Sequence, residues 1–375
     1  MRILIFIPFS LKAPAGNVSR VIESIGLLNE LNYDIVLWNI GERGVYWNDK
    51  INELNPSISY LESSFPKIIV DKIFRFIYII NTVLVNKIKI IEYHRFDCLR
   101  LLSPIIKKIF FNNSFDYVFG NYIWSVELFA NLPNIIDIHD LHKNRHKVIG
   151  KRVWINLSER YENMLFAKAN LLISINFDDL KVLKKSNLNS IYIPYLPNKI
   201  IEAKPGSDVV FVGTNNDVNI SAYFTQKSIG IEKYFEKFKM NLKYFGSIIN
   251  FIRENSNDDV KGEKYFKSLD QIMDGSWAGI NLAPPSTGLK IKSIDYLRSG
   301  KVLICNLNAI DSYLLYYFRD NIVIINNDAD FIDIKLAFDN YDSSKMLKKY
   351  QEISLKIHNL NKNKINEFCN RFSDI

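Results

Sequence analysis

The chain has 375 residues, 48% of them hydrophobic and 23% charged, so its length corresponds to two or three domains with hydrophobic cores of ordinary size. This composition excludes a disordered or fibrous protein, and a content of only 15 glycines excludes collagen-like repeats. Lys and Arg outnumber Asp and Glu by 48 to 40, which gives a net charge of +8. The three cysteines, Cys98, Cys305 and Cys369, are odd in number and far apart, so we expect a reduced, cytosolic protein without disulfides.

An apolar run opens the chain and has two interpretations. It follows the single cation Arg2, as in a signal peptide, but no small-residue cleavage site comes after it. The run also fits a buried first strand over residues 2–8, which we favour. No apolar stretch of about 18 residues occurs, so the sequence predicts no transmembrane helix.

Short β-branched runs then alternate with helical patterns. Helices are predicted over residues 17–32 and 151–169. The further strands predicted in this half cover residues 33–40, 58–63, 115–121, 133–139, 169–175 and 190–195. Apolar strands alternating with helices are typical of a parallel sheet that is covered on both faces.

A basic segment interrupts this series over residues 65–112. Its nine Lys and Arg residues and three acids give it a charge of +6. Cations mixed with apolar residues at helical spacing favour helices that lie on an anionic membrane surface. The alternative is a pair of packed helices with a solvated basic face. The segment has no RNA-binding or helix-turn-helix signature, so we expect no nucleic-acid partner.

A loop with two prolines at residues 196–208 indicates a domain boundary, after which the alternation begins again. The strands predicted in this half cover residues 208–214, 241–247, 277–284, 301–307 and 320–326, and a Lys-rich helical tail covers 343–373. The expected α/β fold thus has two doubly wound, Rossmann-like domains that face a cleft. We place the domains at residues 1–197 and 198–350, with a C-terminal helix at 351–375 that packs back toward the first domain.

Common nucleotide and hydrolase motifs are absent. The chain has no GxxxxGK[ST], GxGxxG or GxSxG, which disfavours P-loop NTPases, dinucleotide dehydrogenases and α/β-hydrolases. Two other glycine turns could hold phosphates, one at residues 213–214 after a strand and one at Gly288 before a helix. Gly288 is expected to open that helix, whose free N–H groups and dipole attract an anion. Lys290 and Lys292 would add positive charge there, and Asp295 could accept hydrogen bonds from sugar hydroxyls. The alternative is a loop with two solvated lysines.

The stretch 284–297 resembles the second-domain motif of the family-four glycosyltransferases, which have the GT-B fold. The motif's glycine, its two basic positions and its acid fall on Gly288, Lys290, Lys292 and Asp295. The runs VVFVGT and NLKYFGS resemble two strands of the same domain. PFSLKAPAGNVSRV resembles the family's loop over the diphosphate and keeps one glycine, Gly16. The resemblance covers most of the chain and is strongest over residues 208–305.

The resemblance implies a fold, a reaction and a set of site residues. It implies transfer of a sugar from a UDP- or GDP-linked donor to a glycan or lipid-linked glycan acceptor, with retention of configuration and without a metal or other cofactor. His139 and Asp140 would be catalytic, and Asn121 would lie on the acceptor side. The donor would be bound by Gly16, Asn17, Gly213, Thr214, Gly288, Leu289, Lys290, Lys292 and Asp295.

Three positions depart from the family pattern. Thr287 replaces the first member of the acid pair, whose second member is Asp295. Asn121 stands where many members have histidine. Residues 214–217, Thr-Asn-Asn-Asp, replace the basic pair that usually follows the first strand of the second domain. Lys290 and Lys292 are therefore expected to neutralise the diphosphate.

Two further groups allow more than one interpretation. His139, Asp140, His142 and His146 could form a metal site, because the last two would share a helix face. We instead expect His139 and Asp140 to contact the sugar or the acceptor, with a structural role as the alternative. Glu159 and Glu162 are predicted to lie on a solvated helix face.

By analogy with the family, the protein would act in bacterial surface polysaccharide synthesis, such as that of O-antigen (lipopolysaccharide) or capsule. It would be cytoplasmic and bound peripherally to the inner face of the cell membrane through residues 65–112. The alternatives are a nucleotide-sugar epimerase or hydrolase of the same fold, and a non-catalytic scaffold docked on the membrane.

Overall fold

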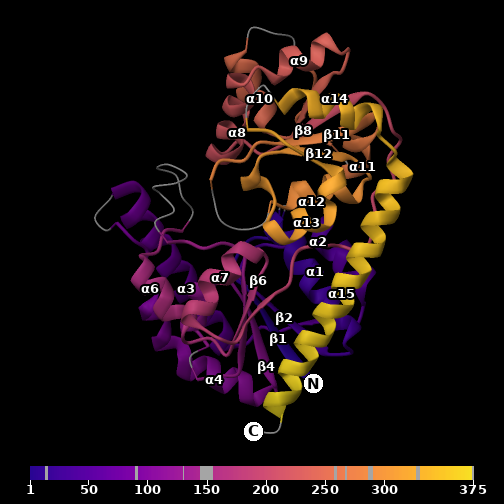
Figure 1. Cartoon of the computed structure of the whole chain (residues 1–375). Coiled ribbons are helices and arrows are strands. Elements are labelled where there is room, and N and C mark those ends of the chain that lie inside the picture. The colour runs from indigo at the N-terminus through magenta and orange to yellow at the C-terminus, as the bar shows by residue number, and fades with distance from the viewer. Residues whose placement is uncertain are drawn as a thin grey trace. The chain divides into compact units, whose positions relative to one another are not determined.

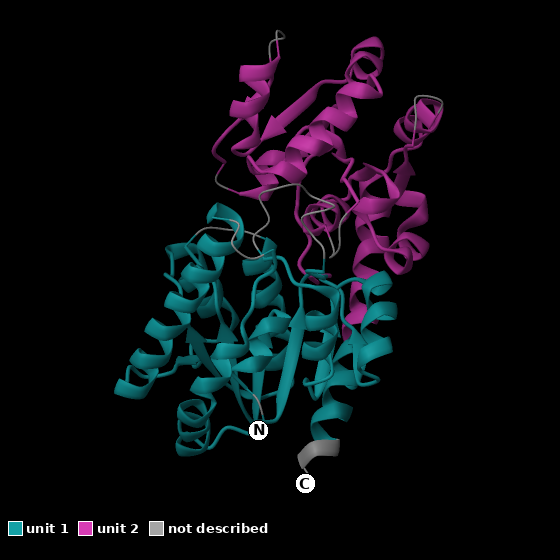
Figure 2. Ribbon diagram, turned by 90° about the vertical axis from the view of Figure 1, so that its left-hand side faces the viewer, with its two compact units in different colours: residues 1–195, 359–375 teal, residues 196–358 magenta. Residues whose placement is uncertain are grey.

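The computed structural model describes residues 1–12, 16–88, 92–129, 131–143, 155–256, 260–266, 268–285, 290–326 and 330–373. The chain forms two compact units, drawn in different colours in Figure 2. Unit 1 comprises residues 1–195 and 359–375, and unit 2 comprises residues 196–358. The sequence predicted domain boundaries after residues 197 and 350, whereas the observed boundaries come after residues 195 and 358.

Unit 1 is built on a seven-stranded parallel sheet in the order β3-β2-β1-β4-β5-β6-β7. The strands are β1 (Arg2–Ile7), β2 (Asp34–Asn39), β3 (Ser59–Tyr60), β4 (Tyr117–Asn121), β5 (Asn134–Ile138), β6 (Leu171–Ser174) and β7 (Ser190–Tyr192). All seven predicted strands are confirmed. The opening apolar run is β1, whose residues 3–7 are fully buried between β2 and β4. Its side chains are apolar on both faces because helices cover both faces (Figure 1).

The helices of unit 1 include α1 (Gly16–Glu30), α2 (Val45–Leu54), α3 (Phe65–Thr82), α4 (Ser103–Asn112), α6 (Glu159–Phe166) and α7 (Phe177–Ser186). The prediction of a helix over residues 151–169 is wrong at its start. The helix begins only at Glu159, because the hydroxyl of Ser158 caps it by accepting a hydrogen bond from Tyr161 N. Residues 155–158 are not helical, and residues 151–154 lie outside the described part of the chain.

Unit 2 has a six-stranded parallel sheet in the order β10-β9-β8-β11-β12-β13. The strands are β8 (Asp208–Val212), β9 (Leu242–Phe245), β10 (Gly262–Glu263), β11 (Ser276–Asn281), β12 (Val302–Cys305) and β13 (Ile322–Ile324). The helices around them include α8 (Asp217–Ser228), α9 (Ile231–Lys237), α10 (Ile248–Asn255), α11 (Leu269–Met273), α12 (Ile291–Arg298), α13 (Ser312–Phe318) and α14 (Phe331–Asp339). The five predicted strands are confirmed, and the two-residue β10 was too short to give a pattern.

The chain ends in the long helix α15 (Ser343–Ser373), drawn in yellow in Figure 1. Its last part belongs to unit 1, where Lys362 pairs with Glu30 and the hydroxyl of Tyr117 donates to the carbonyl of Cys369. Ile365 and Cys369 are buried in the hydrophobic core of that unit. These contacts confirm the prediction that the C-terminal helix packs onto the first domain. Within the described residues, no helix combines the length and apolar character that crossing a bilayer requires.

The two sheets share a topological feature that predicts where ligands bind. In unit 1 the chain moves from β1 outward through β2 and β3, then crosses back to β4 on the other side of β1. In unit 2 the same reversal separates β8 from β11. Open α/β sheets bind ligands at the carboxyl ends of the strands beside such a reversal. Functional residues are therefore expected at the ends of β1 and β4, and of β8 and β11.

Candidate functional site

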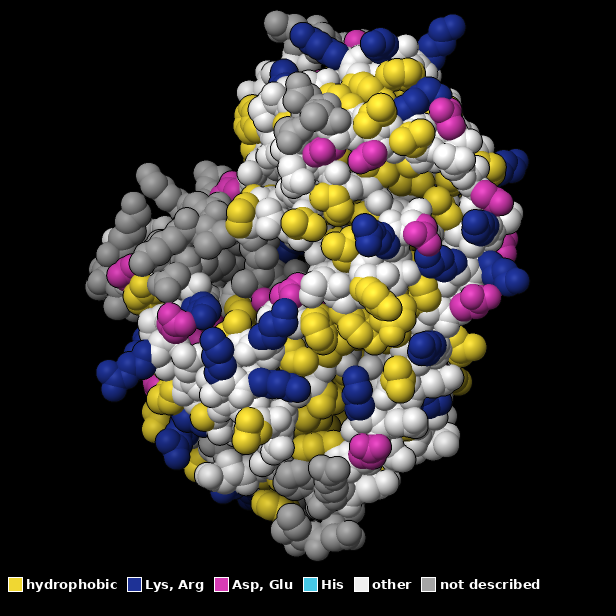
Figure 3. Space-filling view, viewed as in Figure 1, with side chains coloured by type: hydrophobic (Ala, Val, Ile, Leu, Met, Phe, Trp, Pro, Cys, Tyr) yellow, Lys and Arg dark blue, Asp and Glu magenta, His cyan; other side chains and the backbone are white. Residues whose placement is uncertain are grey.

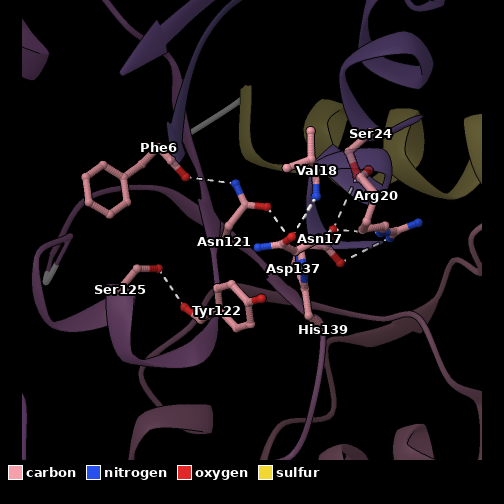
Figure 4. Close-up of polar contacts among 10 residues, drawn as sticks. All are labelled: Phe6, Asn17, Val18, Arg20, Ser24, Asn121, Tyr122, Ser125, Asp137 and His139. Atoms are coloured by element: carbon pink, nitrogen blue, oxygen red, sulfur yellow. Dashed lines mark hydrogen bonds and ion pairs between the residues drawn. The ribbon is translucent and has the colours of Figure 1, made fainter. Parts of the chain in front are cut away.

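A buried ion pair lies at this edge of the sheet in unit 1. Arg20 of α1 donates from Nε to Oδ2 of Asp137 on β5 (2.8 Å) and from Nη2 to Oδ1 (3.1 Å), as Figure 4 shows. The hydroxyl of Ser24 shares its proton between Oδ2 of Asp137 (3.3 Å) and the carbonyl of Arg20 (3.1 Å). Arg20 is 1% exposed and Asp137 is fully buried. Because either charge alone would be very unfavourable in this environment, the pair fixes α1 against the end of β5.

His139 follows the end of β5 and lies against this pair. Its Nε2 is 3.2 Å from Oδ1 of Asn121, the last residue of β4, and 3.6 Å from Oδ2 of Asp137. Asn121 in turn donates from Nδ2 to the carbonyl of Phe6 on β1 (2.8 Å; Figure 4). Burial lowers the pKa of His139 to about 4, although the carboxylate of Asp137 acts in the opposite direction. The ring is therefore neutral at pH 7 and brings no positive charge to the site.

Aromatic rings surround His139. The ring of Tyr122 lies 4.4 Å from that of His139 and 5.7 Å from that of Phe9, measured between centroids, and it stacks on Trp124 at 5.9 Å. Tyr122 has a backbone φ of 67°, which is strained for a residue with a side chain. The hydroxyl of Ser125 donates to the carbonyl of Tyr122 (2.7 Å), and this bond helps to hold the strained turn. Strain retained at the end of a strand is frequent at functional sites.

The predicted residues of unit 1 gather at this edge. The structure brings His139 and Asn121 into direct contact. Asp140 comes next in the chain and is half-buried. Gly16 and Asn17 begin α1; Gly16 is exposed, and the side chain of Asn17 accepts a hydrogen bond from Val18 N (3.0 Å).

The prediction that Glu162 is solvated is wrong. Glu162 is fully buried, and its two oxygens accept hydrogen bonds from the backbone N–H groups of His142 (2.6 Å) and Lys143 (2.9 Å). It therefore holds the chain that leaves β5, and backbone partners of this kind leave no pattern in the sequence. Glu159 is exposed, as predicted, and pairs with Lys143. His146 lies outside the described residues, and within them no group of three or more His, Cys, Asp or Glu could hold a metal ion.

In unit 2, a partly buried amine lies beneath the turn that follows β8. Lys292, in the first turn of α12, donates from Nζ to Oδ1 of Asn219 (2.7 Å) and to the carbonyl of Val212 (3.3 Å). The same amine lies 4.6 Å from the centroid of the Phe211 ring. Asn219 donates onward to the carbonyl of Thr214 (2.9 Å). Burial, reinforced by the charge of Lys290, lowers the pKa of Lys292 to about 7.

Close packing explains the glycine in this turn. A Cβ atom on Gly213 would lie 2.9 Å from Cγ of Asn219, so a side chain would push the turn apart. The same edge depends on Tyr296 of α12, whose hydroxyl accepts a hydrogen bond from Val212 N (3.0 Å). Its ring covers Gly279 on β11 so closely that a Cβ there would lie 2.2 Å from the ring. No sequence motif points to Tyr296, Gly279 or Asn219.

The predicted anion turn before α12 is only partly described. Gly288, Leu289 and Thr287 lie outside the described residues. The described helix begins at Ile291, with Lys290 at its N-cap position. Asp295 pairs with Arg298 (2.9 Å), and burial raises its pKa while Arg298 acts in the opposite direction. Its contact with a ribose stays a prediction.

Comparison with known proteins gives similarity in structure only. No family model matches the sequence, and no curated protein is significantly similar to it. Solved structures match over nearly the whole chain. HepE from Anabaena, solved with UDP and glucose, has a TM-score of 0.61 at 10% identity and covers 98% of this chain and 100% of its own. TarM has a TM-score of 0.65 at 9% identity, with 99% and 98% covered. Sucrose-phosphate synthase from Thermosynechococcus elongatus has a TM-score of 0.57 at 11% identity, with 98% and 97% covered.

The chain has the GT-B fold. Its two sheets are the two Rossmann-like parts of that fold, as the sequence predicted. Each part of this GT-B chain has its own cluster at the reversal of strand order. Asn121 and His139 lie in unit 1, whereas Gly213, Thr214 and Lys292 lie in unit 2.

Proposed function

We propose that the protein is a glycosyltransferase that moves a sugar from a nucleotide-sugar donor to a glycan or lipid-linked glycan acceptor. The observation that carries this proposal is the GT-B fold over the full chain, with polar clusters at both strand reversals. Similar structures support the choice of donor. HepE has been solved with UDP-glucose, and the trehalose-6-phosphate structure from E. coli contains UDP-2-fluoro glucose.

The nucleotide would bind to unit 2. Gly213 and Thr214 form the turn at the end of β8, and Lys292 lies directly beneath that turn. A diphosphate at this point would favour the charged form of Lys292, because an opposite charge raises the pKa of an amine. Lys290 would add a second cation. Asp295 would bind the ribose hydroxyls in place of its present partner, Arg298.

Leaving-group stabilisation would supply most of the catalysis. The two lysines would stabilise the charge that develops on the departing diphosphate. His139 and Asp140 of unit 1 would contact the reacting sugar and orient it. His139 would do so as a neutral ring, since its pKa lies near 4. Retention of configuration is part of the proposal and rests on the resemblance alone.

We also propose that α3 rests on an anionic membrane surface, where lipid-linked acceptors of bacterial polysaccharides are assembled. The helix buries Val70 and Phe74 but exposes Phe65 (75%), Phe76 (62%) and Ile79 (59%). Lys and Arg side chains also occur over other surfaces (Figure 3), so charge alone does not single out α3. α3 combines its exposed apolar side chains with the exposed cations Lys72 and Arg75, and a surface-bound helix needs both.

A thermal-shift screen with UDP, GDP, CMP and ADP tests the donor site. Ligand at about 100 times its dissociation constant stabilises the folded state by about 2.7 kcal/mol, which raises Tm by a few degrees. One nucleotide should shift the wild type and shift a Lys290→Ala/Lys292→Ala variant much less. Lys349→Ala, which removes an exposed pair with Asp320 in the same unit, is the matched control. No shift with any nucleotide would count against the proposal.

Vesicle sedimentation tests the membrane surface separately. The protein should sediment with vesicles that contain phosphatidylglycerol and stay in solution with pure phosphatidylcholine. A Phe76→Ser/Ile79→Ser variant should lose most of this binding. Equal binding by the variant would show that α3 is not the contact.

A further inference from the structure

The hydrogen bonds around His139 determine which of its nitrogens carries the proton. Nε2 faces two oxygen atoms, Oδ1 of Asn121 at 3.2 Å and Oδ2 of Asp137 at 3.6 Å. The amide of Asn121 cannot be reversed, because its nitrogen donates to the carbonyl of Phe6, and a carbonyl can only accept. Asp137 is held as an acceptor by Arg20 and Ser24. A ring nitrogen between two acceptors must be the donor, so the proton is on Nε2.

The other ring nitrogen is left as an acceptor. Nδ1 of His139 has no hydrogen-bond partner among the described residues, and it is not one of their fully enclosed polar atoms. Nε2 of His94, by contrast, is fully enclosed without a partner. In a neutral ring protonated on Nε2, Nδ1 carries a lone pair and can only accept. His139 therefore offers one acceptor at the ligand-binding edge of the sheet.

Four ionisable groups influence the pKa of the His139 ring. Asp137 of β5 and Asp140 in the following loop favour its charged form, whereas Arg20 of α1 and His142 oppose it. Asn121 of β4 contacts Nε2 without bringing a charge. A carboxylate in place of Asn121 would put a second negative charge beside Asp137 and favour the imidazolium. A neutral amide avoids this while still accepting the proton of Nε2.

We propose that Asn121 is a positioning residue, which holds His139 as the neutral Nε2–H tautomer so that Nδ1 accepts a hydrogen bond from a sugar hydroxyl. This inference rests on the proposed function and gives Asn121 a different role from the predicted contact with the acceptor. It also restricts the ligand chemistry at this point. A hydroxyl group can donate to Nδ1, whereas a phosphate or carboxylate has no proton to donate at pH 7 and meets no positive charge on the ring.

The tautomer can be measured without any substrate. Two-bond ¹H–¹⁵N correlation spectra of the full chain with ¹⁵N-labelled histidine distinguish the two neutral forms, and the signals that disappear in His139→Gln assign the ring. At pH 7 the wild type should show protonated Nε2 and unprotonated Nδ1. Asn121→Leu removes one acceptor and should shift the ring toward a mixture of tautomers.

Two further variants separate positioning from a merely structural effect. Asn134→Leu is the matched control, because Asn134 is also buried but lies at the amino end of β5, where it bonds to Leu132 and Asn170. It should leave the tautomer of His139 unchanged. Asn121→Asp keeps an acceptor for Nε2, so it should preserve the tautomer while raising the pH at which the ring titrates. This variant also serves as the test if Asn121→Leu does not fold.

The measurements distinguish a failure of this inference from a failure of the proposed function. Protonated Nδ1 in the wild type, or an unchanged tautomer and titration in both Asn121 variants, would overturn the inference. With UDP-glucose as the probe, Asn121→Leu should lower kcat/KM about threefold to tenfold, the value of one hydrogen bond, and leave the Kd for UDP unchanged. If the wild type neither binds UDP nor turns over UDP-glucose but shows the expected tautomer, the proposed donor fails while the placement of Asn121 stands.

Discussion

Replacing Arg20 with methionine tests the role of the buried ion pair at the edge of unit 1. The change removes both hydrogen bonds to Asp137 and leaves a fully buried carboxylate with only Ser24 and His139 beside it. Breaking a buried pair by removing one partner typically costs about 3–5 kcal/mol. We expect Arg20→Met to lower the free energy of unfolding of unit 1 by that amount.

The matched control is an exposed pair in the same unit. Lys181 and Asp178 lie 3.2 Å apart with side chains that are 66% and 47% exposed. Lys181→Met should cost less than about 1 kcal/mol, because solvent screens such a pair. A double variant, Arg20→Met/Asp137→Leu, should recover most of the loss, because no unpaired charge remains in the core.

Urea unfolding followed by tryptophan fluorescence measures these differences. Four of the five tryptophans lie in residues 1–195 and only Trp277 belongs to unit 2, so a Trp277→Phe background reports on unit 1 alone. All variants are compared in that background. A loss below about 1 kcal/mol for Arg20→Met, or a double variant no more stable than the single one, would refute the reasoning.

Three other predictions concern pH and packing. Burial lowers the pKa of both His94 and His139 to about 4, so below pH 6.5 the unfolded chain binds more protons than the folded chain. The free energy of unfolding should therefore decrease as the pH is lowered, by about 2 kcal/mol per histidine at pH 5. Urea titrations at pH 7 and pH 5 should show this loss, and a variant with glutamine at both positions should show little of it. Diphosphate binding should raise the pKa of Lys292 from about 7, so affinity should fall as pH rises above 7. Calorimetry in buffers of different ionisation enthalpy should detect proton uptake, and its absence would contradict the placement of the amine. Gly279→Ala should displace the ring of Tyr296, cost about 1–3 kcal/mol of stability and weaken nucleotide binding; an unchanged melting temperature would contradict that packing.

The sequence predicted the sheets well, because strands buried on both faces are apolar throughout. The first run, residues 2–8, is the clearest example, and its position inside the sheet, between two other strands, agrees with that composition. The hydrophobic pattern does not predict an element that is very short, or a helix boundary that is set by a capping residue. The strand β10 has two residues, and α6 begins at residue 159 because of the serine before it.

The candidate site could be predicted only in part. The resemblance identified Lys292 and His139, and both lie at a strand reversal. It did not identify what they contact, because those partners are brought close only by the fold. One partner of the buried ion pair, Asp137, does leave a signal in the sequence. A carboxylate in the middle of a buried apolar strand requires a partner.

A transfer assay tests the central claim most directly. The full chain would be incubated with radiolabelled UDP- and GDP-sugars, with and without a lipid extract from a polysaccharide-producing bacterium as acceptor. We predict that label from one donor moves into the lipid or glycan fraction with equal release of nucleoside diphosphate, and that Lys290→Ala/Lys292→Ala abolishes most of this transfer. Donor hydrolysis at the same rate without acceptor would indicate a hydrolase. No consumption of any donor would contradict the account.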